Sequence, residues 1–179
     1  EINMLSIPNK ELKIKFIEAL SYEANNEEDE FSRIMKNSEN LLKATIEQDA
    51  KSMSRFLKDA HSLYSSLLTY NNENSLSCVI QMAYITALKK YEIHRELKGG
   101  EGFAEFVFIP YDKNATAFIL ELKVDSTPED ALEQIKNKNY VQSLRNIRGP
   151  KLAIGITYNS KNTNTNDNRQ HFVKIEELQ

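Results

Sequence analysis

The chain has 179 residues, 40% of them hydrophobic and 27% charged, with one cysteine; disorder, an internal disulfide and a cysteine-based zinc site are therefore excluded. Its net charge of −3 argues against a strong free-standing nucleic-acid binder. No apolar stretch reaches the roughly 20 residues that cross a bilayer, and no signal peptide opens the chain, so we expect a cytoplasmic protein without membrane contact.

The first third of the chain is predicted to be helical. Apolar residues recur three and four positions apart, which is the spacing of one helix face, in residues 9–20, 31–37, 41–48 and 50–68. We expect residues 1–69 to form a helical layer. Because the chain starts at Glu1 and not at Met, we also expect it to be a piece of a longer protein or a chain trimmed at its start.

The middle of the chain changes from helical to strand periodicity. Residues 76–91 are apolar almost all round, which predicts a helix packed between other elements. From Tyr91 onward, short apolar runs separated by turn residues predict three strands, over residues 91–97, 102–110 and 116–124. Strands joined by such short turns favour an antiparallel meander.

A further helix and two strands complete the predicted fold. Thr127 can cap a helix that has Pro128 at its first position and Asp130 three residues after the cap, and that runs to about Leu144. Two strands follow, over residues 151–158 and 171–178. A strand, a helix and a strand in this order allow a right-handed crossover. We therefore predict an α/β fold: a helix, a three-stranded antiparallel meander, a helix and two strands, preceded by the helical layer.

Charge is distributed unevenly along the chain. Residues 1–133 hold 15 basic and 23 acidic side chains, whereas residues 134–179 hold 8 basic and 3 acidic ones. The carboxyl-terminal part could thus face phosphate groups. A solvated helix face and loop is the alternative. The candidate nucleic-acid contacts are Lys136, Lys138, Arg145, Arg148 and Lys151.

Three charged residues stand out within the apolar strands. Glu121 and Lys123 lie two apart in the third strand and therefore on the same side of it. Glu105 interrupts the apolar second strand in the same way. Such groups are costly to bury unless they pair or bind something. If the two strands pair through the turn that joins them, Glu105 and Glu121 can hold one divalent cation.

Carboxylate ligands of this kind suit Mg²⁺ or Mn²⁺. The cation would polarise a phosphate, and Lys123 would orient the attacking water or neutralise charge on the phosphate. The alternative is a buried ion pair between Lys123 and one of the two glutamates, without a cation or catalysis. His61 and His171 have no metal-ligand spacing, and His94 and Cys78 are interpreted as structural.

The order of these motifs resembles the PD-(D/E)XK nuclease superfamily. The resemblance rests on GGEGFAEFVFIP, AFILELKV and PEDALEQIKNKNY, and it covers residues 70–179, a restriction-endonuclease-like core. It is specifically similar to the carboxyl-terminal nuclease-like module of bacterial AAA-ATPase-like proteins. The segment LSIPNKE near the start of the chain resembles the junction between the ATPase part of those proteins and this module. In that family the strand acid is usually Asp, whereas here it is Glu105.

The resemblance implies further residues and a function. It assigns Gln134 to positioning the substrate or a water, and Glu73 to the metal site alongside Glu105 and Glu121. It implies a Mg²⁺- or Mn²⁺-dependent nuclease that acts on DNA or RNA, with DNA the favoured partner, with an AAA-type ATPase domain in the same chain and a homodimer as one arrangement. The alternative is an inactive nuclease fold that binds nucleic acid or protein.

Overall fold

A computed structural model describes residues 30–64, 73–97, 104–137, 144–158 and 171–178. The predicted helix over residues 9–20 lies outside these ranges. The elements are, in chain order, α2 (Glu30–Ile46), α3 (Ala50–Tyr64), α4 (Glu73–Ala83), the 3-10 helix η1 (Ile85–Lys89), β1 (Tyr91–Leu97), β2 (Ala104–Pro110), β3 (Ala117–Val124), α5 (Pro128–Asn137), β4 (Lys151–Tyr158) and β5 (His171–Glu177).

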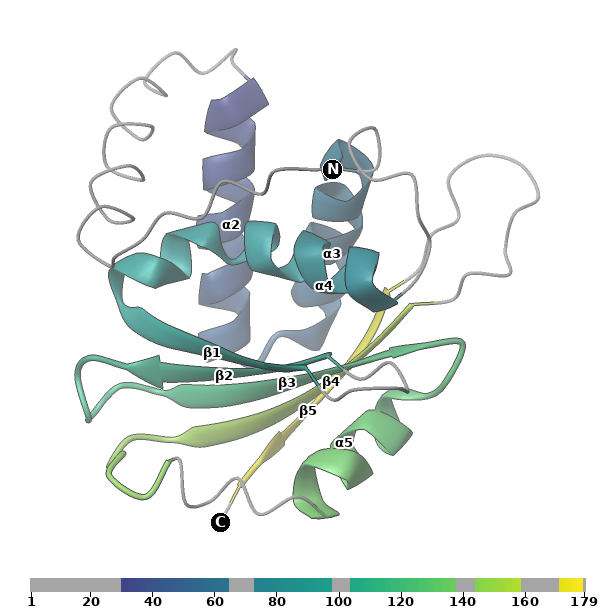
Figure 1. Ribbon diagram of the computed structural model, residues 1–179. Coiled ribbons are helices and arrows are strands. Elements are labelled where there is room, and N and C mark those ends of the chain that lie inside the picture. Colours follow the sequence, from purple (N-terminus) through teal and green to yellow (C-terminus); the bar gives the residue numbers. More distant parts are fainter. Residues whose placement is uncertain (1–29, 65–72, 98–103, 138–143, 159–170, 179) are drawn as a thin grey trace.

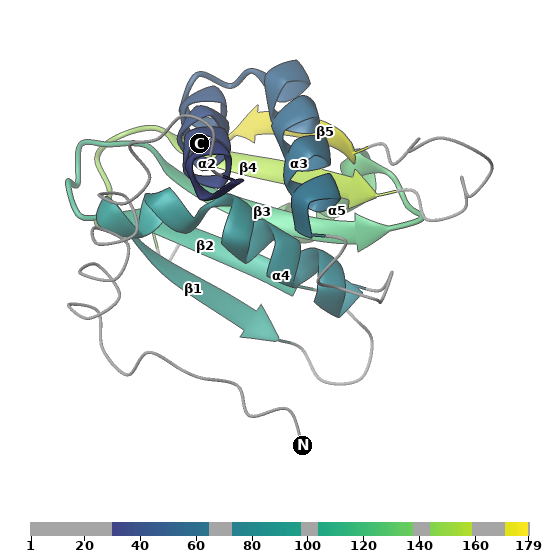
Figure 2. The same ribbon diagram turned by 90° about the horizontal axis from the view of Figure 1, so that it is seen from above.

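The described strands form one sheet in the order β1-β2-β3-β4-β5. The first three strands are antiparallel neighbours, which confirms the predicted meander. After α5 the chain returns as β4, parallel to β3, and β5 then pairs antiparallel with β4. Helices α2, α3 and α4 cover one face of the sheet and α5 covers the other (Figures 1 and 2). The α/β fold class is as predicted.

Each face of the sheet has its own core. On the face of α2 to α4, Phe108 and Phe118 stack with ring centroids 4.2 Å apart, and the amino-terminal helices add the fully buried Met53 and Leu57 to the same cluster. On the opposite face, a smaller cluster joins Ile119 to Leu132 of α5 and to its neighbours. Strand β3 is buried on both faces because its apolar run packs against both layers.

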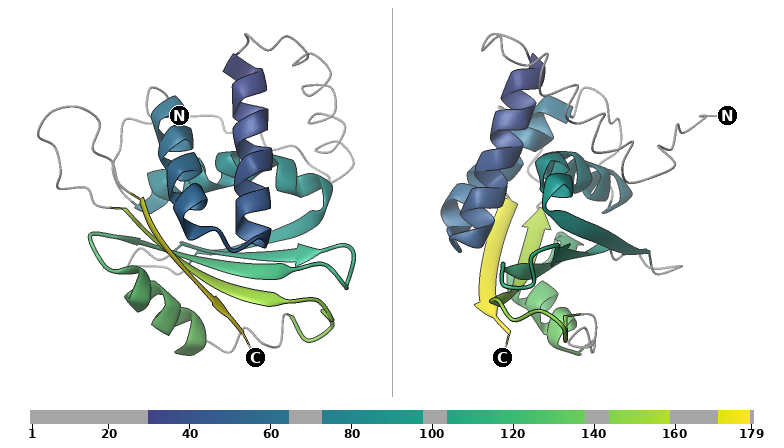
Figure 3. Two further views of the ribbon diagram at one scale, coloured as in Figure 1. Left: turned by 180° about the vertical axis from the view of Figure 1, so that it is seen from behind. Right: turned by 90° about the vertical axis from the view of Figure 1, so that its left-hand side faces the viewer.

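Helices α2 and α3 stand on the sheet as part of the main core. The side view shows them on the opposite side of the strands from α5 (Figure 3). The predicted division of the chain into residues 1–69 and 70–179 stays a prediction. No helix in the described ranges has the length and the apolar character needed to cross a membrane.

The predicted helix over residues 76–91 is divided in the structure. Helix α4 ends at Ala83 and is followed by η1, where Ala87 N–H donates to Tyr84 at 2.9 Å, three residues back. The Tyr84 hydroxyl forms a buried 2.7 Å hydrogen bond with Thr45 of α2. Burial, the dominant cause, raises the pKa of this hydroxyl well above its usual value. Tyr84 is thus anchored in the core directly before η1, and this short 3-10 helix connects α4 to β1, which begins at Tyr91.

Helix α5 begins as predicted and is described as far as Asn137. The Asp130 N–H donates to the Thr127 hydroxyl, and the Thr127 N–H donates to the Asp130 carboxylate, both at 3.2 Å, which is a reciprocal cap. The predicted continuation of this helix to about Leu144 falls on residues 138–143, which lie outside the described ranges, and Leu144 itself lies in a turn.

Candidate active site

The register between β2 and β3 places Glu105 directly opposite Glu121. Residues that face each other in an antiparallel pair lie on the same face of the sheet, with Cβ atoms about 5 Å apart. The Glu121 side chain is 0% exposed. The Glu105 side chain lies outside the described ones, and the register alone gives the position of this residue. The two acids thus occupy neighbouring positions on the face that α5 partly covers.

Lys123 follows Glu121 on the same face of β3 and reaches across to α5. Its Nζ donates a 2.5 Å hydrogen bond to Oε1 of Gln134, and both side chains are half-buried. The structure therefore brings together three of the predicted site residues, Glu121, Lys123 and Gln134, and places Glu105 next to them by register. Glu73 is the first residue of α4, and its side chain lies outside the described ones.

Two carboxylates in these positions need a compensating positive charge. Like charges directly opposite each other in a sheet destabilise it, and burying Glu121 adds a desolvation cost. Lys123 supplies one cation on the same face. A divalent ion would supply more, and a pair of carboxylates is a donor set that Mg²⁺ and Mn²⁺ accept. Among the described side chains, no group of three His, Cys, Asp or Glu is placed to hold a metal.

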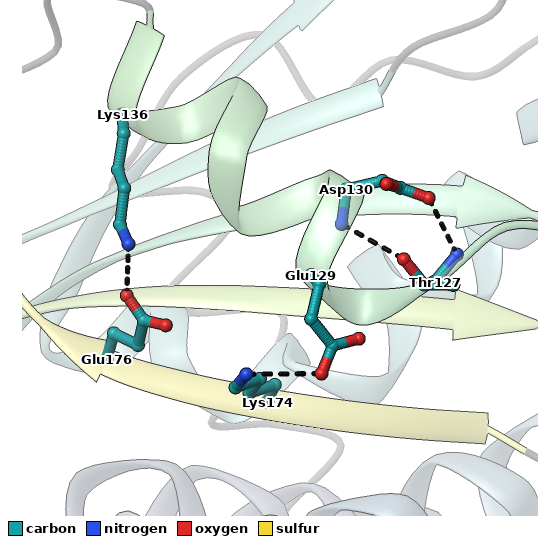
Figure 4. A network of polar contacts seen from close by, with 6 residues as sticks. All are labelled: Thr127, Glu129, Asp130, Lys136, Lys174 and Glu176. Atoms are coloured by element: carbon teal, nitrogen blue, oxygen red, sulfur yellow. Dashed lines mark hydrogen bonds and ion pairs between the residues drawn. The ribbon is translucent and has the colours of Figure 1, made fainter.

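Helix α5 lies over β4, with different partners on its two sides. Gln134 reaches toward β3, whereas Lys136 forms a 2.5 Å ion pair with Glu176 of β5 (Figure 4). Glu129 pairs with Lys174 of β5 at 3.1 Å on the same side. Hydrogen bonds from Thr127 and then from Ser126 hold the pKa of Asp130 below its usual value, and keep this cap charged. Helix α5 is thus held in place along both sides.

The other predicted nucleic-acid contacts lie at a distance from Lys123. Lys151 begins β4 opposite Ala117, six positions before Lys123 in β3. At about 3.3 Å per residue, that spacing is about 20 Å along the sheet. Arg145 and Arg148 are exposed in the segment that leads into β4, and Lys138 lies outside the described ranges. Lys136 is nearer, but it lies on the β5 side of α5, away from Gln134.

Two features of the structure escaped the sequence interpretation, one of them beside the site. Glu96 of β1 stands opposite Glu105, so three glutamates occupy one line across β1, β2 and β3. The alternation of residues along β1 is the signal that could have identified Glu96. Elsewhere, His61 Nδ1 and His171 Nε2 lie 3.2 Å apart in a buried contact against the Tyr158 ring. These histidines are 110 positions apart, and no local pattern predicts their contact.

A five-stranded mixed sheet with an acid on β2, Glu-x-Lys on β3 and a helix directly afterwards defines a restriction-endonuclease-like α/β protein. Residues 71–168 match the family model of the PD-(D/E)XK nuclease superfamily. The match covers more than half of the chain, and the chain belongs to that superfamily. No curated protein matches it. Nucleases of this superfamily generally use divalent metal ions.

Proposed function

We propose that this chain is a metal-dependent nuclease that hydrolyses phosphodiester bonds at the Glu121 and Lys123 site. The observation that carries the proposal is the arrangement around the buried Glu121: Glu105 is opposite it in the register, and Lys123 beside it is bonded to Gln134. Membership of the nuclease superfamily supports the same reaction.

Glu105 and Glu121 would hold the cation; Glu73, at the start of α4 on the other face of the sheet, stays a predicted further ligand. When bound, Mg²⁺ or Mn²⁺ supplies Lewis acidity toward a phosphate and toward water. Glu121 and Lys123 lie two positions apart on β3, so the strand fixes where the carboxylate and the ammonium stand relative to each other. The negative group would hold the cation, and the positive group would face the phosphodiester.

Lys123 would neutralise charge that develops on the phosphate, or orient the attacking water. Its ammonium is directed toward α5 by the Gln134 carbonyl oxygen, which accepts a hydrogen bond from it. This hydrogen bond restricts the long lysine side chain to one region above β3. Preorganising a cation in this way lowers the cost of placing it in the transition state.

The likeness of the chain's motifs to those of the family supports a proposal for the substrate and the partners. DNA is proposed rather than RNA, and LSIPNKE supports an AAA-type ATPase domain in the same chain. A homodimer is proposed as the arrangement that would cut both strands. These proposals rest on the likeness of motifs, and each is separate from the proposed chemistry of the site.

Cleavage of single- and double-stranded DNA and RNA in Mn²⁺ and in Mg²⁺ tests the activity. We expect Glu121→Gln and Lys123→Gln to reduce the cleavage rate by about 100-fold or more, because each removes a charge needed in the transition state. The matched control is Glu133→Gln on the exposed side of α5, which should cut as the wild type does.

Thermal melting gives a second readout that does not depend on turnover. A cation that binds the folded chain raises the melting temperature, and this rise should vanish in Glu121→Gln. No cleavage and no rise would favour the inactive nuclease fold that binds nucleic acid or protein. Cleavage by Glu105→Asp alone would instead assign the inactivity of the wild type to its longer strand acid.

A further inference from the structure

The end of the sheet farthest from Lys123 collects basic side chains from three separate segments. The Tyr111 N–H donates to the Lys90 carbonyl at 3.0 Å, and the Arg148 N–H donates to the Lys113 carbonyl at 2.8 Å. These backbone bonds join the end of η1, the turn between β2 and β3, and the segment before β4, which lie at one end of the sheet in Figure 1. We call this surface the basic end; its cations are Lys90, Lys113, Arg145, Arg148 and Lys151.

The basic end carries an excess of positive charge. All of its cations except the half-buried Lys151 are exposed, and none forms an ion pair with any residue in the described ranges. Three acids lie beside these cations in the chain or in the sheet: Asp112 in the turn itself, Glu92 at the start of β1, and Glu177, which pairs with Leu152 of β4. Five cations against three acids leave a net positive charge. In a chain whose net charge is −3, such a cluster indicates a local preference for anions.

An aromatic side chain lies among these cations. Tyr111 is 42% exposed, in the turn between Lys90 and Lys113. Exposed rings interleaved with Lys and Arg suit a partner with both phosphates and stacking bases. An acidic protein surface would match the charges but would make no use of the ring. The chemistry therefore favours nucleic acid as the occupant.

We propose that the basic end binds the phosphate backbone of the DNA that the candidate active site cuts, remote from the cut itself. This inference rests on the proposed nuclease function and adds a second contact region to it. It combines Arg145, Arg148 and Lys151 with Lys90 and Lys113, which no sequence pattern connected. It leaves out Lys136, whose ammonium is paired with Glu176 on the β5 side of α5.

The register sets the minimum length of DNA that can reach both regions. Lys151 and Lys123 lie about 20 Å apart along the sheet, from six residues at about 3.3 Å each. Successive phosphates of one strand advance by about 3.4 Å along a duplex, so the span corresponds to about six base pairs. DNA that extends less than this from the cut would lose the contact with the basic end.

Binding of a labelled duplex of about 24 base pairs, long enough to span both regions, tests the proposal. Fluorescence anisotropy without divalent cations separates binding from cleavage. The test variant is Lys113→Gln with Arg148→Gln, and the matched control is Arg33→Gln with Lys36→Gln on the exposed face of α2. Both double variants lose one Arg and one Lys from exposed positions, and melting temperatures should show that both fold as the wild type does.

We expect the basic-end variant to bind about tenfold more weakly at low salt, and the slope of log K against log salt to fall by about two. The control variant should keep both values. Wild-type affinity should also rise once a hairpin stem exceeds about six base pairs, and the basic-end variant should lack that rise.

Equal binding by the two double variants overturns the inference, as does a wild-type chain that binds no duplex at low salt. Either result would leave an acidic protein surface as the partner of this end. Failure of the proposed function has a different signature. A wild-type chain that binds the duplex through the basic end, but never cuts it in Mg²⁺ or Mn²⁺, overturns the nuclease activity alone.

Discussion

At the scale of single residues, the site was predicted from the alternation of side chains along a strand, which repeats every two residues. Glu121 and Lys123 share a side of β3 whatever the sheet around them is, because alternate side chains of a strand point the same way. Gln134 is different, since its contact with Lys123 crosses from a helix to a strand. Family resemblance assigned Gln134 a role, but only the packing of α5 shows which group it touches.

The Lys123 to Gln134 hydrogen bond gives a prediction about one side chain. Gln134→Leu keeps the size of the side chain and removes the carbonyl acceptor. We expect the free energy of unfolding to fall by about 1 kcal/mol, because the donor is charged but half-exposed. We expect cleavage to fall by about tenfold, since Lys123 would lose its orientation. Chemical denaturation and cleavage rates measure the two effects.

The conservative control for this position is Gln134→Glu, which retains an oxygen that can accept from Lys123. Its stability should match that of the wild type more closely than that of the leucine variant. If Gln134→Leu cuts at the wild-type rate, the hydrogen bond has no part in positioning Lys123, and the role of Gln134 in the proposed site is wrong.

At the scale of elements, the crossover from β3 through α5 to β4 positions the site. The reciprocal cap of α5 could be predicted from the sequence, because the capping residues are three positions apart. The close approach of α5 to β4 could not be predicted from it. Gly155 pairs with Glu121, and a Cβ atom on Gly155 would lie 2.2 Å from the Pro128 carbonyl oxygen. The helix can lie this close only because the strand has no side chain there.

Gly155→Ala therefore tests the packing of α5 against the sheet. Because the added methyl group meets backbone, which cannot move aside as a flexible side chain can, α5 must shift away from β4. We expect a loss of about 3 kcal/mol in the free energy of unfolding. The cation-induced rise in melting temperature should shrink as well, since Gln134 moves with the helix.

A glycine on the same strand is not available as a control, so Ala153→Gly serves in its place. That change removes a buried methyl group from the same face and should cost about 1 kcal/mol without moving α5. A Gly155→Ala chain that is as stable as the wild type would show that α5 is not held against β4 in the way described.

At the scale of the whole molecule, the amino-terminal helices and the sheet share one core. Leu57 of α3 is fully buried in the cluster that contains Phe118 and Leu122 of β3. The sequence indicated amphipathic helices in this region but not the surface they cover. The boundary at residues 69 and 70 stays a prediction, and it falls between helices α3 and α4, outside the described ranges.

Leu57→Ala tests the shared core. Truncating a fully buried leucine should lower the free energy of unfolding by about 2 to 5 kcal/mol. Because α3 packs on the strands, helix and sheet should unfold together in one transition at a lower temperature. Far-ultraviolet circular dichroism measures the loss of secondary structure, and tyrosine fluorescence measures the loss of the packed core. Two separate transitions, with that of the sheet unchanged, would contradict a common core.

The sequence by itself determined the class of the fold, the antiparallel meander of its first three strands and the parity of Glu121 and Lys123. These follow from local periodicity and from caps and turns, which act over a few residues. Tertiary structure alone decided the register that sets Glu105 and Glu96 in line with Glu121, the close approach of α5, the buried contact between His61 and His171, and the gathering of the basic end. Each of these depends on segments far apart in the chain, whose relative positions are decided by packing and not by any local pattern.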